Sequence, residues 1–286
     1  MMAGMPKRYL APALLVFLLA AAARAQETAA PEAKQAAVET AAPLRLSLAW
    51  DGSAVATSAA AVGLSTLISV DTTSRWQTQL LPIDDHVKGR YSAQAAKASD
   101  ILLAVDVVTP VALFAGRGFD GEVGKRVVIY SETLLAGLAL NSLVKSLVGR
   151  PRPYVYSDDP AVVAYAEGQG RDSHLSFYSG HASTTFSASV AGAYLFAQST
   201  SDSTARAAVW GTELALAGAT ADLRTRAGKH FYSDVLVGAV VGSGLGVLVP
   251  YLHGGPRVRL SKLEWLAIVL GPLVGIAVGE LLPVGG

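Results

Sequence analysis

The sequence contains no cysteine. Disulfide bonds and thiolate chemistry are therefore excluded, and the redox compartment cannot be inferred from cysteine usage. Charged side chains are also scarce, because Asp, Glu, Lys and Arg make up only 16% of the 286 residues, compared with about 25% in an ordinary soluble protein. The formal net charge is +1, so bulk charge gives no reason to expect a nucleic-acid partner.

Apolar residues, in contrast, make up 51% of the chain, and the mean hydropathy is +0.39. A membrane-spanning helix needs about 20 mainly apolar residues. By this criterion the third, fifth, sixth and seventh apolar segments are the better candidate spans, and the first, second and fourth could instead be buried core helices. We predict an all-α membrane bundle of about six apolar helices. The seven segments, in chain order, cover residues 53–70, 100–116, 127–148, 182–198, 207–223, 231–253 and 263–282.

The polar stretches and the acidic residues within apolar segments lead to further expectations. Residues 71–99, which include Asp84-Asp85-His86, are predicted to be an extramembrane loop with a short helix, and residues 151–177 are predicted to be a polar loop. Charged groups are costly in lipid and usually face a bundle interior or a cavity. We therefore expect interior positions for four carboxylates, those of Asp106, Glu132, Glu213 and Glu280.

The first of three polar clusters lies at the end of the third apolar segment. Six residues separate Lys145 from Arg152, and Pro151 and Pro153 stiffen the chain as it leaves the helix. Taken alone, this pattern is typical of a patch of cations that stops transfer at a membrane edge. Glu132 lies about 20 Å from Lys145 along a helix with a rise of about 1.5 Å per residue, so we predict a helix-packing role for it.

The second cluster, Ser179-Gly180-His181, stands just before a small-residue segment that begins at Ala182. A helix N-terminus presents free N–H groups and the positive end of a dipole, which together bind anions. Gly180 allows the backbone to approach the ligand closely, and His181 could donate a proton to a leaving oxygen. Taken alone, the three residues would also fit a simple capped turn.

The third cluster runs from Arg224 to Asp234. His230 and Asp234 are four residues apart, which makes them neighbours on one face of a helix. A carboxylate there can accept the Nδ1 proton of the imidazole and leave Nε2 free to attack. Arg224 is expected to fold back over the group that His230 attacks. Taken alone, the cluster would also fit a polar helix start on a solvated face.

Together the clusters resemble the three-part signature of the type 2 phosphatidic acid phosphatase (PAP2) superfamily, which includes vanadium haloperoxidases and bacterial class A acid phosphatases. The pattern Lys, six residues, Arg-Pro is matched by Lys145, Arg152 and Pro153. The pattern Pro-Ser-Gly-His is matched with Tyr178 in place of proline. The third pattern is Ser-Arg, then His after five residues, then Asp after three more, and it is matched with Leu223 in place of serine. Order and spacing agree, and the resemblance covers about residues 127–253.

The resemblance implies a helical bundle with a phosphatase site at one membrane face, without a metal or other cofactor. It implies that His230 is the nucleophile that forms a phosphohistidine, that Asp234 orients it, and that His181 is the general acid. Covalent attack divides one difficult step into two, and cations neutralise charge on the transferring group. The phosphate oxygens would be bound by Lys145, Arg152, Ser179, Gly180 and Arg224.

Four regions are predicted along the chain. Lys7 and Arg8 precede an apolar run, and Ala23-Arg24-Ala25 fits a cleavage site, so residues 1–25 are expected to be a signal peptide, with an uncleaved signal anchor as the alternative. Residues 26–43 are rich in Ala, Glu, Thr and Pro and are expected to be a flexible linker. Residues 44–255 form the predicted phosphatase bundle, and residues 256–286 a C-terminal apolar helix.

We expect a phosphatase that hydrolyses a phosphate monoester or diphosphate, with a membrane lipid phosphate as substrate. One alternative is a periplasmic non-specific acid phosphatase on a soluble scaffold. Another is a catalytically degraded lipid-binding membrane protein, suggested by Tyr178 and Leu223. A haloperoxidase is disfavoured because those enzymes are not expected to be so rich in apolar segments. The loops at 71–99 and 151–177 are expected to select the substrate.

The clusters are predicted to share one membrane face, because two crossings separate the second from the third. Positive loops favour the cytoplasm, so we predict an inner-membrane protein of the bacterial envelope with a periplasm-facing site. A cleaved signal followed by three full spans would give the opposite orientation, but the first apolar segment is a weak span. The cations expected at the opposite face are Arg117, Lys125, Arg126, Arg206, Arg257, Arg259 and Lys262.

Overall fold

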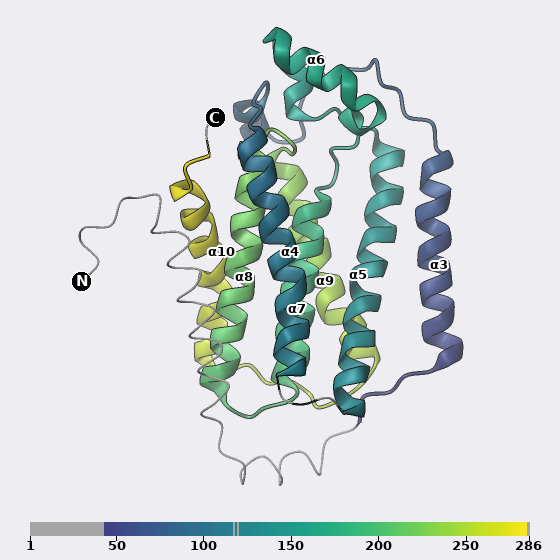
Figure 1. Cartoon of the computed structure of the whole chain (residues 1–286), viewed down its shortest axis with the longest axis vertical. Helices are drawn as coiled ribbons and strands as arrows, with labels where there is room; N and C mark the ends of the chain where they lie inside the picture. The colour runs from purple at the N-terminus through teal and green to yellow at the C-terminus, as the bar shows by residue number, and fades with distance from the viewer. Residues whose placement is uncertain (1–42, 117, 119, 285–286) are drawn as a thin grey trace, which may run out of the picture.

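The structure is a computed structural model that describes residues 43–116, 118 and 120–284. The predicted signal peptide, all but the last residue of the predicted linker, and Arg117 lie outside these residues. The described residues form no β-strand, which confirms the predicted all-α bundle (Figure 1). The long helices are α3 (Leu48–Leu67), α4 (Ala93–Ala115), α5 (Gly121–Val148), α7 (Gly180–Ala197), α8 (Ser203–Arg226), α9 (Tyr232–Leu252) and α10 (Lys262–Leu281).

Each long helix contains most of one predicted apolar segment, and the largest differences lie at the helix starts. Polar first turns extend α4 and α5 by several residues beyond the apolar pattern, and α3 begins five residues before its apolar segment, at Leu48. An N-cap oxygen can accept a hydrogen bond from a free N–H group of the first turn, so these polar starts are stable. The caps that do so are Ser47, Ser92, Asp120, Ser179, Asp202 and Ser261.

The polar loops are more ordered than the sequence suggested. The 3₁₀-helix η1 (Pro82–Val87) confirms the short helix expected within residues 71–99. The loop at 151–177 holds η2 (Pro153–Tyr156), α6 (Pro160–Gln169) and η3 (Gly170–His174), and α6 was not predicted. Asp159 caps α6 and Pro160 begins it, which is a favoured pair at a helix start. In Figure 1, α6 lies across the upper end of the bundle.

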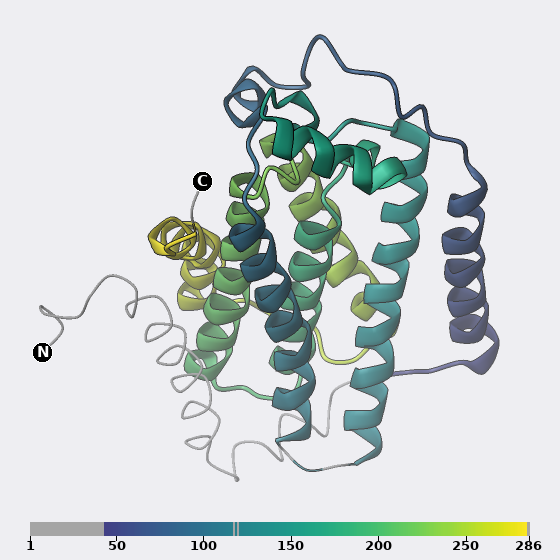
Figure 2. The ribbon, with the colours of Figure 1, turned by 45° about the horizontal axis from the view of Figure 1, so that its top comes forward.

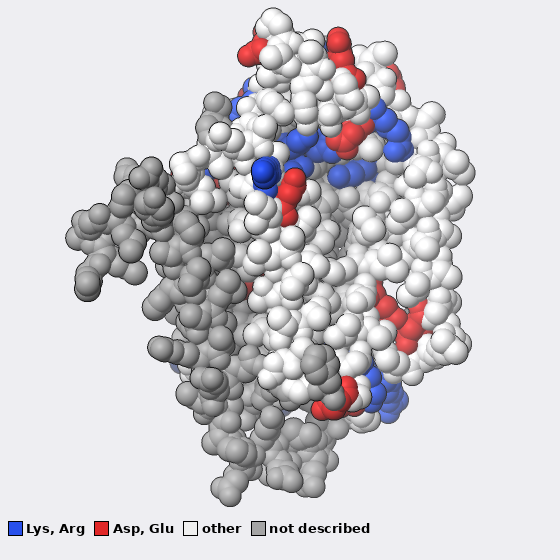
Figure 3. Space-filling view, in the orientation of Figure 1, with Lys and Arg blue, Asp and Glu red and all other residues white. Residues whose placement is uncertain are grey.

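Among the described residues, four helices, α4, α5, α9 and α10, are long and apolar enough to cross a membrane. This supports a membrane protein, but the expected ranking of spans is wrong for two segments. The second apolar segment, in α4, qualifies, whereas the fifth, in α8, does not. Charged residues lower the hydropathy of α8, and neighbouring helices bury most of its length. Figure 3 shows charged side chains gathered towards both ends of the molecule, with a mostly uncharged face between them.

Helix α7 is the centre of the bundle, where it contacts α4, α5, α8 and α9. Most of its residues are buried, and many are Ala or Ser. Helix α9 packs on α7 through Gly238, Gly242 and Gly246, because a Cβ at each would lie within 3.2 Å of a backbone atom of α7 or its N-cap. Gly244, on the same helix, has no atom within 4 Å of its Cβ position. The spacing of four residues puts the other three on one helix face.

On the other side of the bundle, α10 packs against α8. Gly271 and Gly275 of α10 lie against the backbone of α8 at Gly211 and Ala215. The contact joins the C-terminal helix to the bundle, whereas α3 lies on the opposite side beside α5 (Figures 1 and 2). The proposed division of the chain at residue 256 remains a prediction.

Three of the four carboxylates within apolar segments lie inside the bundle, as expected. Asp106 and Glu213 are buried, and Ser189 Oγ donates to Asp106 and to the Glu213 backbone oxygen, at 3.0 and 2.8 Å. Glu132 is buried beside His253. The expectation is wrong for Glu280, which is exposed because it lies in the last turn of α10.

Candidate active site

The three polar clusters meet at one end of the bundle, as the order of the helices predicted. Lys145 lies in the last turn of α5, and Gly149, with φ of +59°, ends that helix and directs the chain towards Arg152. The second cluster begins α7, and the third joins the end of α8 to the start of α9. In Figures 1 and 2 this is the upper end of the bundle, beneath α6.

The His230 side chain is 1% exposed and lies in the turn before α9. Its Nδ1 is 2.8 Å from the backbone oxygen of Ser176, which can only accept a hydrogen bond, so we assign the proton to Nδ1. Nε2 then carries the lone pair of the ring and accepts a hydrogen bond from a guanidinium nitrogen of Arg152 at 3.3 Å. Burial and the nearby charges of Arg152 and Lys145 hold the pKa of His230 well below its usual value. The imidazole is therefore neutral.

Asp234 is not placed as predicted. Its Oδ2 is 3.7 Å from Nδ1 of His230 and instead accepts from Ser176 Oγ at 2.5 Å and from the backbone N–H of Phe231 at 2.9 Å. The i, i+4 argument fails because His230 precedes the first residue of α9, so the two side chains do not share a helical face. Asp234 is therefore joined to His230 by hydrogen bonds through Ser176, whose backbone oxygen accepts from the ring.

Arg150 was not predicted as a site residue, yet it is fully buried beneath the cluster. It donates to Asp234 at 2.6 Å, to Asp84 of η1 at 3.0 Å and to Ser233 Oγ at 2.8 Å. Asp84 also accepts from the backbone and side chain of Ser233. Arg150 thus joins the loop at 71–92 to the start of α9, and it fixes the carboxylate that holds Ser176.

Arg152 faces His230 because Asp172, another unpredicted residue, holds it in place. Asp172 accepts two hydrogen bonds from the guanidinium of Arg152, at 2.8 Å through its backbone oxygen and at 2.8 Å through its carboxylate. A third donor contacts the backbone oxygen of Lys229 at 3.0 Å. The guanidinium group of Arg152 also faces His230, so it is already positioned to bind an anion that reaches Nε2.

Lys145 lies against the start of α7. A Cβ at Gly180 would be 3.4 Å from Lys145 Nζ and 2.8 Å from the side-chain oxygen of Asn141. Asn141 in turn donates to the backbone oxygen of Tyr178 at 2.8 Å. A side chain at this position would displace the Asn141 amide and crowd Lys145. Asn141 is thus a further residue of the site that the sequence alone did not indicate.

His181 and Arg224 are joined by Asp100 of α4, which the motifs did not include. One carboxylate oxygen of Asp100 lies 2.8 Å from His181 Nε2 and 3.4 Å from Arg224. His181 is in the first turn of α7, outside the four candidate spans. Burial and the charge of Arg224 lower the pKa of His181 to about 4, although Asp100 opposes this shift.

The Ser179 side chain has a mainly structural role. Its Oγ caps α7 by accepting from Ala182 N at 3.3 Å, and its backbone N–H donates to the Asp234 backbone oxygen at 3.0 Å. The latter bond ties the second cluster directly to the third. Within the described part of the chain, the N–H groups of Gly180 and His181 have no acceptor, which leaves them available to an anion.

Lys229 adds a fourth cation at the edge of the cluster. Its ammonium group lies 5.1 and 4.9 Å from the ring centroids of Tyr154 and Tyr165, and it donates to the Tyr165 hydroxyl. Burial and the charges of Arg152 and Arg224 lower the pKa of Lys229 to about 8. The whole arrangement is a neutral imidazole in a ring of fixed cations, which suits a tetrahedral phosphate group.

Comparison with protein families agrees with this geometry. The model of the PAP2 superfamily matches residues 126–257. This part of the chain belongs to the PAP2 superfamily. The match contains all three clusters, and membership supports a phosphatase-type function in general. No curated protein and no solved structure matched the chain.

The two departures from the PAP2 signature lie in packed positions. Tyr178 is 2% exposed, and its backbone oxygen accepts the hydrogen bond from Asn141. Leu223 is fully buried and packs with Ala95 and Ala227 between α4 and the end of α8. A side chain in this apolar cluster stabilises the position of Arg224, the next residue.

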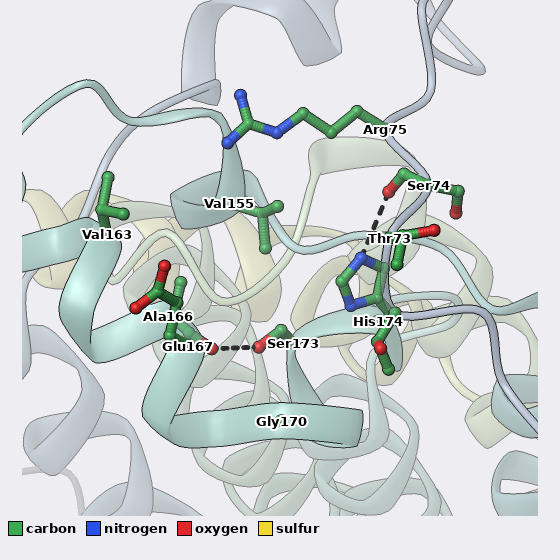
Figure 4. A pocket seen from close by; sticks show the side chains of 11 residues that line it. Thr73, Ser74, Arg75, Val155, Val163, Ala166, Glu167, Gly170, Ser173 and His174 are labelled. Atoms are coloured by element: carbon green, nitrogen blue, oxygen red, sulfur yellow. Dashed lines mark hydrogen bonds between the residues drawn. The ribbon is translucent and has the colours of Figure 1, made fainter.

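A separate pocket of about 380 Å³ lies on the outer side of η3. Figure 4 shows that the loop at 72–75 faces α6 and η3 across it, with His174 hydrogen-bonded to the Ser74 backbone oxygen at 3.2 Å. The site residues predicted from the sequence do not line this pocket. It is formed by Thr72, Thr73, Ser74, Arg75, Val155, Val163, Ala166, Glu167, Gly170, Ser173 and His174.

Proposed function

We propose that this protein hydrolyses a phosphate monoester or diphosphate of a membrane lipid through a phosphohistidine on His230. One observation carries the proposal: Nε2 of a neutral, buried imidazole faces Arg152 at 3.3 Å. Lys145 and Arg224 are close enough to His230 to lower its pKa together with Arg152. The cations can therefore hold a phosphate group against the nucleophile and stabilise charge in the transition state.

The reaction has two steps. In the first, Nε2 of His230 forms a bond to phosphorus, the bond to the leaving oxygen breaks, and His181 donates a proton to that oxygen. In the second, water attacks the phosphohistidine with His181 as the base, and inorganic phosphate is released. The N–H groups of Gly180 and His181, with Ser179 Oγ, would assist Lys145, Arg152 and Arg224 in binding the phosphate oxygens.

A lipid substrate is supported by the position of the cluster at the end of the candidate membrane helices. Leu236 and Val240, on successive turns of α9, are 58% and 65% exposed, as expected of a surface in contact with acyl chains. The pocket on the outer side of η3 is formed by the two loops that we expected to select the substrate. We therefore propose that these loops select the headgroup.

The test is release of inorganic phosphate from a panel of lipid phosphates and lipid diphosphates in detergent. Wild type should be active, and His230→Ala should lose more than about 10³-fold in kcat/KM while it stays folded, because the nucleophile is removed. His86→Ala, an exposed histidine in η1 at the same end, is the matched control and should keep full activity. Undiminished turnover by His230→Ala would refute the mechanism.

A further inference from the structure

A polar cluster distinct from the three sequence clusters lies at the end of the bundle opposite the candidate phosphatase site. It joins Asp51 in the first turn of α3, Glu132 of α5 and His253, which follows the last residue of α9. All three are buried, with exposures of 8%, 8% and 6%. His253 Nε2 is 3.3 Å from Asp51 Oδ1 and 3.1 Å from Glu132 Oε2. Three parts of the chain therefore place one nitrogen and two carboxylate oxygens around a single point.

The orientation of His253 indicates what this cluster binds. Its Nδ1 is 2.8 Å from the backbone oxygen of Val249, which can only accept a hydrogen bond, so Nδ1 carries the ring proton. Nε2 faces two carboxylate oxygens, so either a second ring proton or a bound cation must lie between them. Three such groups repel one another unless a positive species lies among them. A backbone oxygen on the second nitrogen is also the usual arrangement behind a histidine that binds a metal.

The contacts of the two carboxylates also favour a bound cation. The Oδ2 atom of Asp51 accepts the backbone N–H of Ser47 at 2.6 Å, which turns Oδ1 towards His253. The Oε1 atom of Glu132 is buried and has no hydrogen-bond partner among the described residues. An unpaired buried carboxylate oxygen is costly, and a cation held by the same carboxylate would satisfy it.

We propose that Asp51, Glu132 and His253 bind a divalent transition-metal ion, with Zn²⁺ as the best fit to one imidazole and two carboxylates. Ligands about 2.1 Å from a tetrahedral ion are separated by about 3.4 Å, close to the 3.1 and 3.3 Å from Nε2 to the two oxygens. All the ligand atoms lie within 4.8 Å of one another. Glu132 Oε1 or water would complete the coordination.

The ion would fix α3 to the rest of the bundle. Asp51 and Ser65 are the buried residues of α3, so little else holds this helix by burial. The chain just before it is also attached at His253, since Arg45 N donates to the His253 backbone oxygen at 2.9 Å and Leu44 pairs with Gly254. A metal bridge from α3 to α5 and His253 would add to these contacts.

The experiment is zinc titration of the untagged full-length protein in detergent after treatment with a chelator, followed by calorimetry and thermal unfolding. Wild type should bind one equivalent of Zn²⁺, and its Tm should rise by roughly 5 °C at a zinc concentration about 100 times Kd. Glu132→Gln and His253→Ala should each weaken binding by more than about tenfold. His230→Ala should bind zinc like wild type, so the result is independent of the phosphatase mechanism.

Two matched controls keep the test specific. Glu122→Gln, on α5 at the same end and paired with Lys125 on the surface, should leave zinc binding unchanged, as should His86→Ala at the other end. Glu132→Gln retains the shape of the side chain, so loss of binding without loss of folding can be observed. If wild type binds no zinc or manganese, or if Glu132→Gln binds zinc as tightly as wild type, the proposal is overturned.

Discussion

At the scale of single residues, the two histidines of the candidate site have different surroundings. His230 is buried, has a lowered pKa and is held by the Ser176 backbone oxygen, with Nε2 facing Arg152. His181 is less buried and is held by the carboxylate of Asp100. A general acid must carry a proton, so the pH dependence of the reaction should depend on the pair formed by His181 and Asp100.

We expect kcat/KM to be highest in acid. The pKa of His181 in the free protein is lowered to about 4, so the protonated fraction falls as the pH rises through that value. Burial and the nearby cations also lower the pKa of His230, which favours its neutral form. Asp100 raises the pKa of His181, so Asp100→Asn should move the decline of kcat/KM to lower pH.

The measurement is the pH profile of kcat/KM for wild type and Asp100→Asn with one substrate, so that ionisation of the substrate cancels. Asp85→Asn, which removes an exposed carboxylate paired with Lys88, is the control. A decline that stays at the same pH or moves to higher pH in Asp100→Asn would exclude this role for the pair.

Arg150 should matter more for stability than for chemistry. Its removal leaves Asp84 and Asp234 buried without their cation, and breaking a buried pair in this way costs about 3–5 kcal/mol. Arg150→Met should therefore lower Tm strongly, and Asp84→Asn in the same chain should restore part of the loss. Thermal unfolding in detergent measures both, with exposed Lys97→Met as control. Equal Tm values for Arg150→Met and Lys97→Met would contradict the account.

The motif residues could be predicted from spacing, but their supports could not. Lys145, Arg152, His181, Arg224 and His230 are brought together as expected. Arg150 is separated by 84 residues from one carboxylate partner and by 66 from the other, and pairing over such distances depends on the final packing of loops. The misplaced hydrogen bond of Asp234 has a local cause, because the helix starts two residues after His230.

At the scale of elements, the site depends on close contact between α7 and α9. His181 lies in the first turn of α7 and His230 precedes α9, so the distance between these helices sets the distance between the two imidazoles. Gly238, Gly242 and Gly246 allow the two backbones to approach closely. Small residues have the same role in many membrane helix pairs.

Gly242→Ala should separate the helices. The added Cβ would lie 3.0–3.1 Å from backbone atoms of Ser183 and closer still to its backbone oxygen, and such overpacking costs about 1–3 kcal/mol. Gly244→Ala, on the same helix with no neighbour at its Cβ position, is the matched control and should be neutral. Tm and kcat should both fall in Gly242→Ala alone. Identical behaviour of the two variants would contradict this packing.

The positions of the long helices were largely predictable from apolar segments, but two features were not. Helix α6 was missed because residues 151–177 are polar overall, although Asp159-Pro160 is a recognisable helix start. Helix α8 was ranked as a span because residues 207–223 are mostly apolar. Its hydropathy over the full helix is reduced by charged residues, including Arg206 and Arg226, whose partners lie on α10 and the chain around it.

At the scale of the whole molecule, the two polar centres lie at opposite ends of one bundle. The phosphatase site is beneath α6, and the proposed metal site is beside the start of α3 (Figure 1). The second end also carries the basic residues Lys125, Arg126, Arg206 and Arg257. Because positive loops favour the cytoplasm, we propose that the phosphatase site faces the periplasm of a bacterial inner membrane.

The absence of native cysteine allows this orientation to be tested by single substitutions. Asp158→Cys is exposed beside α6, and Arg257→Cys is exposed at the opposite end. In intact spheroplasts, a membrane-impermeant maleimide should label Asp158→Cys and should label Arg257→Cys only after lysis. The reverse pattern would place the site in the cytoplasm and would contradict the orientation inferred from the loop charges.

The central claim is that His230 carries the phosphoryl group during turnover, and trapping that group tests it most directly. Wild type should be mixed with a substrate labelled in its transferable phosphate, quenched in alkali within one turnover, and examined by peptide mass spectrometry. The account predicts a base-stable, acid-labile phosphate on His230, absent from His230→Ala and present in His86→Ala. A label on another residue, or phosphate release by wild type with no labelled protein at any time, would contradict it.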